Sequence, residues 1–132
     1  MQASFRREAE PTHKVFYGDD GLSREEWWLN GKLHRLDGPA EIWYSDDGTR
    51  EENWHRHGRF YRKSGPTYVA TYADGGWMET YLLSYRRGTR VHRLDGPAIT
   101  RVDADGRRTR EWWRNRRKLT ARYDRVPPPQ TQ

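Results

Sequence analysis

The hexapeptide HRLDGP occurs twice in this chain, at His34–Pro39 and again at His92–Pro97. A divergent copy, YRKSGP, lies between them at Tyr61–Pro66. Nine residues after the proline of each copy comes the glycine of an Asp-Gly pair: Gly48, Gly75 and Gly106. Each copy is also preceded by a further glycine: Gly31, Gly58 and Gly88. The copies are spaced 27 and then 31 residues apart. Self-similarity at a nearly fixed period is typical of repeat architectures, in which each unit is stabilised by its neighbours.

The repeat carries two kinds of turn. Asp-Gly and Asn-Gly pairs tolerate the positive φ of tight hairpins, while the proline of Gly-Pro fixes its own φ and donates no hydrogen bond. The runs between the turns, such as EIWYS and TYVATYA, are rich in β-branched and aromatic residues. No stretch shows a sustained apolar period of 3.6. The sequence therefore predicts an all-β fold, an antiparallel meander of about four tandem β-hairpin repeats of 27–31 residues with seven to nine short strands.

Composition indicates a thin sheet. Charged and hydrophobic residues each make up 33% of the chain, which is lean for a thick core, whereas aromatic residues reach 14%. We expect one repeat domain over residues 11–123, between a flexible N-terminus (1–10) and a flexible, proline-rich tail (124–132). The segments 11–21 and 111–115 are degenerate half-units and are interpreted as caps.

Several classes of protein are excluded by what the sequence lacks. The absence of cysteine excludes a disulfide scaffold, an Fe–S site and a cysteine-based zinc site, and favours a reducing compartment. No apolar run approaches the roughly 20 residues of a membrane span, and the N-terminus is no signal peptide, so we expect a soluble cytoplasmic protein without a membrane partner. His55 and His57 would point the same way on a strand, but two ligands are too few for a metal site. No phosphate-binding loop or catalytic motif is present, and we expect no cofactor.

The repeated arginine of the hexapeptide is interpreted as structural. We predict that it stacks on an aromatic ring, with the nearby aspartate as its partner or as a turn acceptor. The structural repeat residues are Trp27, Arg35, Trp54, Arg62, Arg93 and Trp112, and in the third unit Ser84 is aligned with the missing tryptophan. The alternative is a catalytic His/Arg/Asp cluster, as in a nuclease using His34 or His92. An active site is needed once, whereas this trio recurs with the turn, so we expect no enzyme.

The pattern Trp-x-x-Asn-Gly-Lys-x-His-Arg-x-Asp-Gly-Pro-Ala…Asp-Gly, from Trp27 to Gly48, resembles a known tandem repeat. It is similar to the "His-Arg-x-Asp-Gly-Pro-Ala" repeats of phage and giant-virus proteins, which are related in style to MORN-type β-hairpin repeats. The resemblance covers roughly residues 11–120, and the middle unit departs from it at Tyr61 and Thr67. It implies β-hairpin repeats and a non-enzymatic interaction role, as in a small phage accessory protein that binds a host protein in the host cytoplasm. It supplies no catalytic residues.

The irregular segment 76–91 contains the four extra residues of the third unit. A longer connection in a regular array predicts a bulge or a protruding hairpin. We predict that this hairpin packs on a protein partner or on a second copy of the chain through Trp77, Met78, Tyr81, Leu82, Leu83 and Tyr85. The alternative is that these side chains fill the core of their own repeat.

Charge is distributed unevenly along the chain. Residues 1–66 carry 11 Lys/Arg against 12 Asp/Glu, and residues 67–132 carry 14 against 7. A strand at Arg107–Arg114 would place alternate basic residues and Trp112 on one face. This predicts an alternative function as a nucleic-acid or nucleotide binder, through Arg107, Arg108, Arg110, Trp112, Arg114, Arg116, Arg117 and Lys118. The other interpretation is a solvated basic cap that protects an edge strand.

Overall fold

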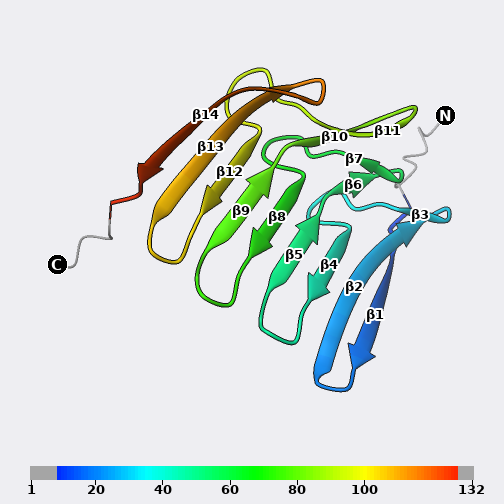
Figure 1. The fold of residues 1–132 in the computed structure, drawn as a ribbon. Coiled ribbons are helices and arrows are strands. Elements are labelled where there is room, and N and C mark those ends of the chain that lie inside the picture. Colours follow the sequence, from blue (N-terminus) through cyan, green and yellow to red (C-terminus); the bar gives the residue numbers. More distant parts are fainter. Residues whose placement is uncertain (1–8, 128–132) are drawn as a thin grey trace, which may run out of the picture.

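The computed structural model describes residues 9–127, and within this range the chain forms fourteen β-strands and no helix (Figure 1). The strands are β1 (Thr12–Gly18), β2 (Gly21–Leu29), β3 (Lys32–Leu33), β4 (Glu41–Tyr44), β5 (Arg50–Asn53), β6 (His55–Arg56), β7 (Arg59–Phe60), β8 (Tyr68–Thr71), β9 (Trp77–Thr80), β10 (Leu82–Tyr85), β11 (Gly88–Val91), β12 (Ile99–Val102), β13 (Arg107–Arg114) and β14 (Arg117–Arg125). The all-β meander is confirmed. The predicted number of strands is too low, because segments read as turns contain short paired strands of their own. Most of the predicted flexible N-terminus (residues 1–8) and the end of the predicted tail (128–132) lie outside the described residues.

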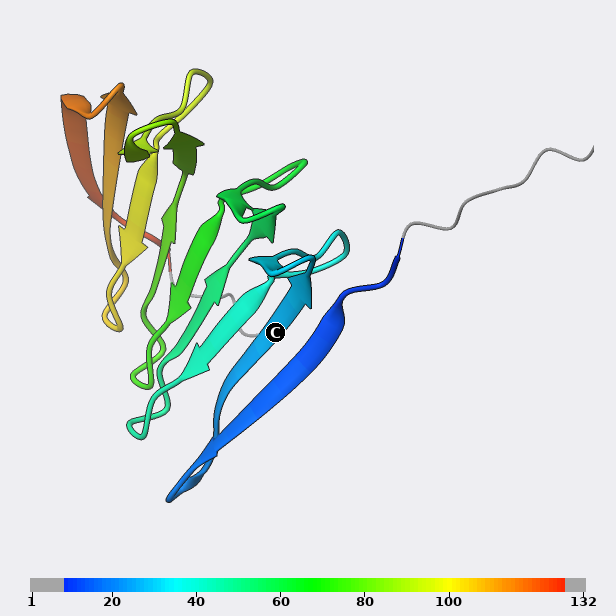
Figure 2. The ribbon, with the colours of Figure 1, turned by 90° about the vertical axis from the view of Figure 1, so that its right-hand side faces the viewer.

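Most strands belong to one antiparallel sheet. Its order is β1-β2-β4-β5-β8-β9-β12-β13-β14, with β3 paired to β2. The pairs β6–β7 and β10–β11 form two small separate hairpins. Figure 2 shows that these hairpins bend away from the end of a sheet that is otherwise a single layer.

Three corners connect the small hairpins or turns back to the sheet. The first, second and third corners are His34–Ala40, Tyr61–Thr67 and His92–Ala98. Each corner ends on a buried small residue, since Ala40 and Ala98 are 0% exposed and Thr67 is 4% exposed. The amide of Ala40 donates to the carbonyl of Asn53, 2.9 Å away, so the corner is joined to the following unit by backbone hydrogen bonds.

The interior is thin, as the composition predicted. Among the described residues the buried hydrophobic side chains are Ala40, Ile42, Ala70, Ala98 and Val102, and no large side chain is fully buried. Stability therefore depends on sheet hydrogen bonds and on half-buried aromatic rings rather than on a packed second layer.

The hairpin turns lie at two opposite ends of the sheet (Figure 1). At the lower end, the Gly48 amide donates to the Ser45 carbonyl (3.0 Å) and Gly48 has φ 92°, the geometry of a three-residue hairpin loop ending in a bulge glycine. At the upper end, pairs of consecutive residues have positive φ, as type I′ turns require: Asn30 and Gly31 (51° and 76°), His57 and Gly58 (49° and 77°), and Asn115 and Arg116 (47° and 69°).

Arg116 occupies the second position of its turn, where the other two turns have Gly31 and Gly58. We expect Arg116→Gly to raise the free energy of unfolding by about 0.5–1 kcal/mol. The left-handed region costs a residue with a side chain about 1–2 kcal/mol, and glycine removes this cost. Part of the gain is offset because glycine makes the unfolded chain more flexible. Urea denaturation followed by circular dichroism measures the change. Arg117→Gly, one residue further and inside β14, is the matched control and should destabilise. An Arg116→Gly protein no more stable than the wild type would contradict the expectation.

Candidate functional site

The arginine of each corner lies flat on an aromatic ring. The Arg35 Cζ atom is 3.9 Å from the centroid of the Trp27 ring, and Arg62 is at the same distance from Trp54. The guanidinium also donates to the corner itself, from Nη1 of Arg35 to the Pro39 carbonyl (3.2 Å) and from Nη1 of Arg62 to the Pro66 carbonyl (3.0 Å). The predicted stacking is confirmed, and it closes the corner onto its own unit.

The corner glycine lies on the other side of the guanidinium from the aromatic ring. We call the space between ring and glycine the arginine slot. A Cβ atom built on Gly38 would lie 2.7 Å from the Cζ atom of Arg35. The same atom would lie 2.9 Å from Arg62 at Gly65 and 2.8 Å from Arg93 at Gly96. Each guanidinium is thus held between a ring and a glycine, which explains why Arg and Gly recur together.

The third unit differs from the sequence alignment. The ring beneath Arg93 belongs to Tyr81, whose centroid is 4.1 Å from the Arg93 Cζ atom. The alignment of Ser84 with the repeated tryptophan of the other units, Trp27 and Trp54, is therefore wrong. The four extra residues lie between Tyr81 and Arg93, in the longer β10–β11 hairpin, so the ring and its arginine are 12 residues apart instead of 8. Ser84 has another contact, because its Oγ accepts a hydrogen bond from the amide of Phe60 (2.9 Å).

The corner histidines hold the turn of the next unit. The amide of His57 donates to Nδ1 of His34 (2.9 Å), and the amide of Asn115 donates to Nδ1 of His92 (3.1 Å). Both donors are the first left-handed residue of a type I′ turn. In the second corner, Tyr61 replaces the histidine, and the next turn, at Arg86 and Arg87, has no such left-handed residue. The histidine therefore recurs together with the type I′ turn whose first amide it binds. Both imidazoles accept this backbone hydrogen bond.

The longer hairpin of the third unit is anchored by Thr67. The Thr67 hydroxyl donates to the carbonyl of Leu82 and accepts from its amide, both at 2.8 Å. The six residues predicted to bind a partner here do not form one surface. Trp77 and Met78 are neighbours on β9 and point to opposite faces, Tyr81 lies beneath Arg93, and Leu83 is the one member of the six that is exposed (37%).

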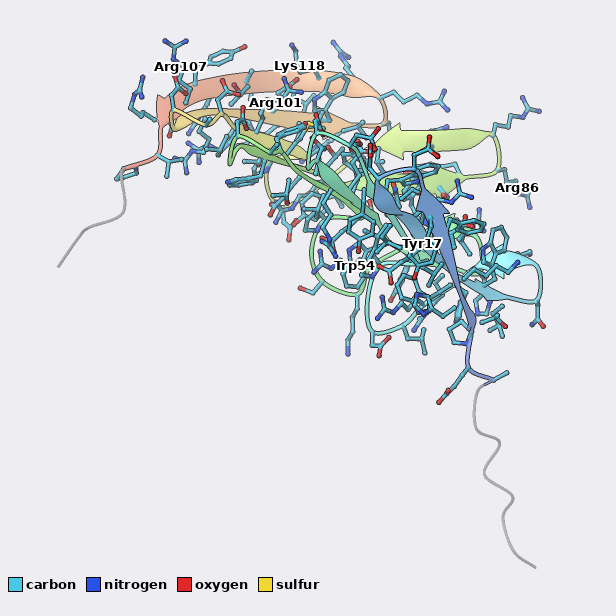
Figure 3. The ribbon with its side chains drawn as sticks, turned by 90° about the horizontal axis from the view of Figure 1, so that it is seen from below. Tyr17, Trp54, Arg86, Arg101, Arg107 and Lys118 are labelled. Atoms are coloured by element: carbon cyan, nitrogen blue, oxygen red, sulfur yellow. The ribbon has the colours of Figure 1, made fainter. Side chains whose placement is uncertain are left out.

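The predicted anion-binding residues do not form one cluster, and several of them are paired with carboxylates. Arg108 and Arg110 both bind Asp124 on β14, with a 2.8 Å bond from Nε of Arg108 and a 3.1 Å bond from Nη2 of Arg110. Figure 3 shows Arg107 and Lys118 far apart along the β13–β14 pair. Arg107 pairs with Asp105 (3.2 Å), and Lys118 lies 3.9 Å from Glu111. Trp112 lies near the guanidinium groups of Arg110 and Arg122.

The pairing with Asp124 persists at neutral pH. The hydrogen bond from Arg108 lowers the pKa of the Asp124 carboxyl, and the same contact raises the pKa of Arg108. Asp124 is therefore ionised and offsets much of the charge at the centre of β13. The members of the set without a carboxylate partner are Arg114, Arg116 and Arg117, at the β13–β14 turn.

The outer edge of β1 is a second exposed feature, which the sequence interpretation did not include. All seven residues of β1 are exposed, and the strand pairs on one side with β2. Val15, Phe16 and Tyr17 are 39%, 36% and 75% exposed, and Leu22 on the neighbouring strand is 38% exposed. The signal was present in the sequence as three consecutive large apolar residues inside a degenerate unit that was interpreted only as a cap.

The two histidines considered for a metal site do not lie on one strand. His55 belongs to β6 and packs on Phe60 with ring centroids 4.3 Å apart, whereas His57 lies in the turn and contacts the His34 ring at 4.2 Å. Burial lowers the pKa of His55. In residues 9–127, no three His, Asp or Glu side chains are grouped so that they could hold a metal ion. This part of the chain also contains no helix of the length and apolarity that crossing a membrane requires.

Two of the concave surfaces of the molecule lie between consecutive corners. One groove is lined by residues of the first two corners, among them Leu36, Trp54 and Tyr61. The arginines that border it, Arg35 and Arg62, are already held by their rings and corner carbonyls. The groove thus presents structural groups rather than a free reactive cluster.

Comparison with known protein families and with curated proteins finds no match for this chain. A functional proposal therefore rests on the geometry of the molecule and on the resemblance of its corner motif.

Proposed function

We propose that this protein is a non-catalytic β-repeat module that binds a partner protein, and that an extended segment of the partner adds a strand to the outer edge of β1. The observation that carries the proposal is that, within residues 9–127, no strand pairs with the outer edge of β1. Three consecutive apolar side chains, Val15–Tyr17, are exposed on a strand with one open side. An exposed edge offers a row of backbone donors and acceptors to another chain, and this is a common mode of peptide recognition.

The opposite edge of the sheet provides the contrast. Five of the nine residues of β14 are charged, namely Arg117, Lys118, Arg122, Asp124 and Arg125. Among the seven residues of β1, Lys14 is the single Lys, Arg, Asp or Glu. Natural sheets protect their edges from pairing with charged side chains, lysine above all. β14 is protected in this way and β1 is not, so the two ends of the same array have different roles.

An added strand would find apolar contacts on both faces of the sheet. Successive side chains of β1 point to opposite faces, and Phe16 already packs beneath the guanidinium of Arg24, which lies 4.2 Å from its ring centroid. A register shift next to Tyr17 leaves Ser23 as an extra residue on β2, and its Oγ donates to the Phe16 carbonyl (3.1 Å). The edge is thus rigidly held at the point where its apolar side chains are exposed.

The resemblance of the corners to repeats of phage proteins supports a host protein as the partner. The repeats then act as a scaffold that keeps one edge strand available. The structural contacts of the corner histidines support the non-catalytic part of the proposal, because both imidazoles accept backbone hydrogen bonds.

The test is an edge-blocking variant. We expect Val15→Lys with Tyr17→Lys to reduce capture of the partner from nuclease-treated host lysate at least about tenfold, because a lysine on each of these positions places charge in the way of a pairing strand. Quantitative mass spectrometry of the captured proteins measures the change.

The matched control is Leu119→Lys with Tyr123→Lys on the other edge. Tyr123 is 76% exposed against 75% for Tyr17, and Leu119 is 52% exposed against 39% for Val15, so the control adds the same charges at exposed positions of the other edge. A partner lost with the β1 variant and kept with the control supports the proposal. Equal capture by all three proteins would contradict it, and so would a wild type that sediments as a dimer and becomes monomeric in the β1 variant, because the occupant would then be a second copy.

A further inference from the structure

The hairpin turns at the two ends of the sheet carry opposite charge. The lower turns, between β1 and β2, β4 and β5, β8 and β9, and β12 and β13, contain exposed aspartates and no Lys or Arg (Figure 1): Asp19, Asp20, Asp46, Asp47, Asp74, Asp103 and Asp105. The upper turns (30–31, 57–58, 86–87 and 115–116) and the strand residues next to them contain no Asp or Glu and carry exposed cations: Lys32, Arg56, Arg59, Arg86, Arg87, Arg114, Arg116 and Arg117. We call this second set the basic rim. It draws on all four upper turns and so differs from the anion site predicted along β13. The corresponding strand residues beside the lower turns include Arg50 and Arg107, and both pair with a carboxylate.

The basic rim is a cluster of cations without carboxylate partners, whereas other unpaired cations of residues 9–127, such as Arg62, Arg101 and Arg122, lie apart in the corners and along the sheet. Seven arginines elsewhere in the sheet and corners lie within ion-pair distance of a carboxylate: Arg24, Arg35, Arg50, Arg93, Arg107, Arg108 and Arg110. Within residues 9–127, none of the eight rim cations does. Concentrating like charges in this way raises the energy of the free protein, since nothing in the described chain neutralises them.

Two neighbouring turns of the rim are joined to each other. Nη2 of Arg116 donates to the carbonyl of Arg87 (3.4 Å), which connects the β13–β14 turn to the tip of the longer β10–β11 hairpin. Figure 3 shows Arg86 at this tip, which extends beyond the sheet. The inserted hairpin of the third unit therefore brings two arginines, Arg86 and Arg87, beside the three of the last turn.

From the unpaired charge and its linear arrangement we infer that the basic rim binds the sugar-phosphate backbone of a nucleic acid. The strands that lead into consecutive rim turns, β2, β5, β9 and β13, are two positions apart in the sheet, which places their ends about 10 Å from each other and spreads these ends over about 29 Å. That length corresponds to roughly nine nucleotides of one strand of a duplex. Seven of the eight cations are arginines, whose planar fork matches phosphate oxygens. A regular line of cations fits a polymer of regularly repeated charge better than the irregular charges of an acidic protein.

The binding should depend steeply on salt and little on sequence. Each neutralised phosphate of a duplex contributes about −0.9 to the slope of log affinity against log salt, so eight contacts give a slope near −7, or about four orders of magnitude between 50 and 200 mM salt. Phosphate contacts position a protein without specifying bases. Fluorescence anisotropy with a labelled 20-base-pair duplex, and with one of its strands alone, measures both properties and shows which form is preferred.

The test compares two variants of equal net charge. The rim variant replaces Arg86, Arg87, Arg114 and Arg117 with Gln, and we expect it to lower the size of the duplex slope by up to about 3.6. The control variant replaces Arg101, Arg107, Arg122 and Arg125 with Gln, all exposed and outside the rim, and should keep a slope close to that of the wild type. The β1 edge variant should bind the oligonucleotide normally, which separates this site from the proposed protein-binding edge.

Three results would overturn the inference. The first is no binding by the wild-type protein at 50 mM salt. This result does not depend on whether any variant folds. The second is an equal loss of slope in the rim and control variants, which would mean that net charge alone decides the affinity. The third is competition by polyglutamate at the same charge concentration as effectively as by unlabelled duplex, which would assign the rim to an acidic polypeptide.

Discussion

Replacing Gly38 with alanine is expected to lower the free energy of unfolding by about 2 kcal/mol. The added Cβ atom would lie 2.7 Å from the Cζ atom of Arg35, so the guanidinium must leave the Trp27 ring. Because the guanidinium is the mobile end of a long side chain, it relieves the clash by moving, and the loss is that of a cation–π contact and of the hydrogen bond to the Pro39 carbonyl. Gly38 does not have a positive φ, so backbone strain does not contribute. Urea denaturation followed by circular dichroism measures the effect.

A double-mutant cycle identifies the cause of this loss. In an Arg35→Ala background the space beside Gly38 is empty, and Gly38→Ala should then cost less than about 0.5 kcal/mol. Gly18→Ala is the control on an exposed strand, because its Cβ atom would meet only Ser23 at an ordinary 3.7 Å. Suppose Gly38→Ala lowered the free energy of unfolding as much in the Arg35→Ala background as in the wild type. The contact with Arg35 in the arginine slot would then not explain why position 38 is glycine.

Arg93→Ala is expected to destabilise the protein by about 2 kcal/mol. The change removes the stacking on Tyr81, the 3.0 Å bond to the Pro97 carbonyl and the 3.0 Å bond to Asp95. Arg93→Lys should recover little of the loss, since an ammonium cannot lie flat on the ring and reach both acceptors. Arg35→Ala should behave alike to within about 0.5 kcal/mol, because its contacts are equivalent.

Thermal unfolding of these variants should be compared with that of Arg101→Ala. Arg101 is exposed and contacts only the Met78 Sδ atom, at 3.5 Å, so its removal should change the stability by less than about 0.5 kcal/mol. An Arg93→Ala protein as stable as the Arg101→Ala protein would show that the stacking does not hold the corner. Binding to the β1 edge should be unaffected in the folded Arg93→Ala protein, because the third corner lies next to β12 and β13, away from β1.

The corners were predictable because their contacts are local. Arg35 reaches the Pro39 carbonyl four residues on and Asp37 two residues on, and the same spacing recurs at Arg93. Contacts between residues at short, fixed separations repeat whenever the sequence repeats. The turn residues also act locally, through the φ angles that glycine, asparagine and proline accept. The sequence by itself therefore determined the β-hairpin repeat, its turns and the role of the repeated arginine.

The tertiary structure decided which side chains meet across strands. Asp124 lies opposite Arg108 because β13 pairs with β14 in one register, and this contact removes the centre of the predicted anion site. Tyr81 lies beneath Arg93 because the extra residues form a hairpin that returns the chain to the same position. Both results depend on strand register and loop path, which spacing along the chain does not specify. The free edge of β1 and the basic rim have the same origin, since folding places turns from four units along one end of a single sheet.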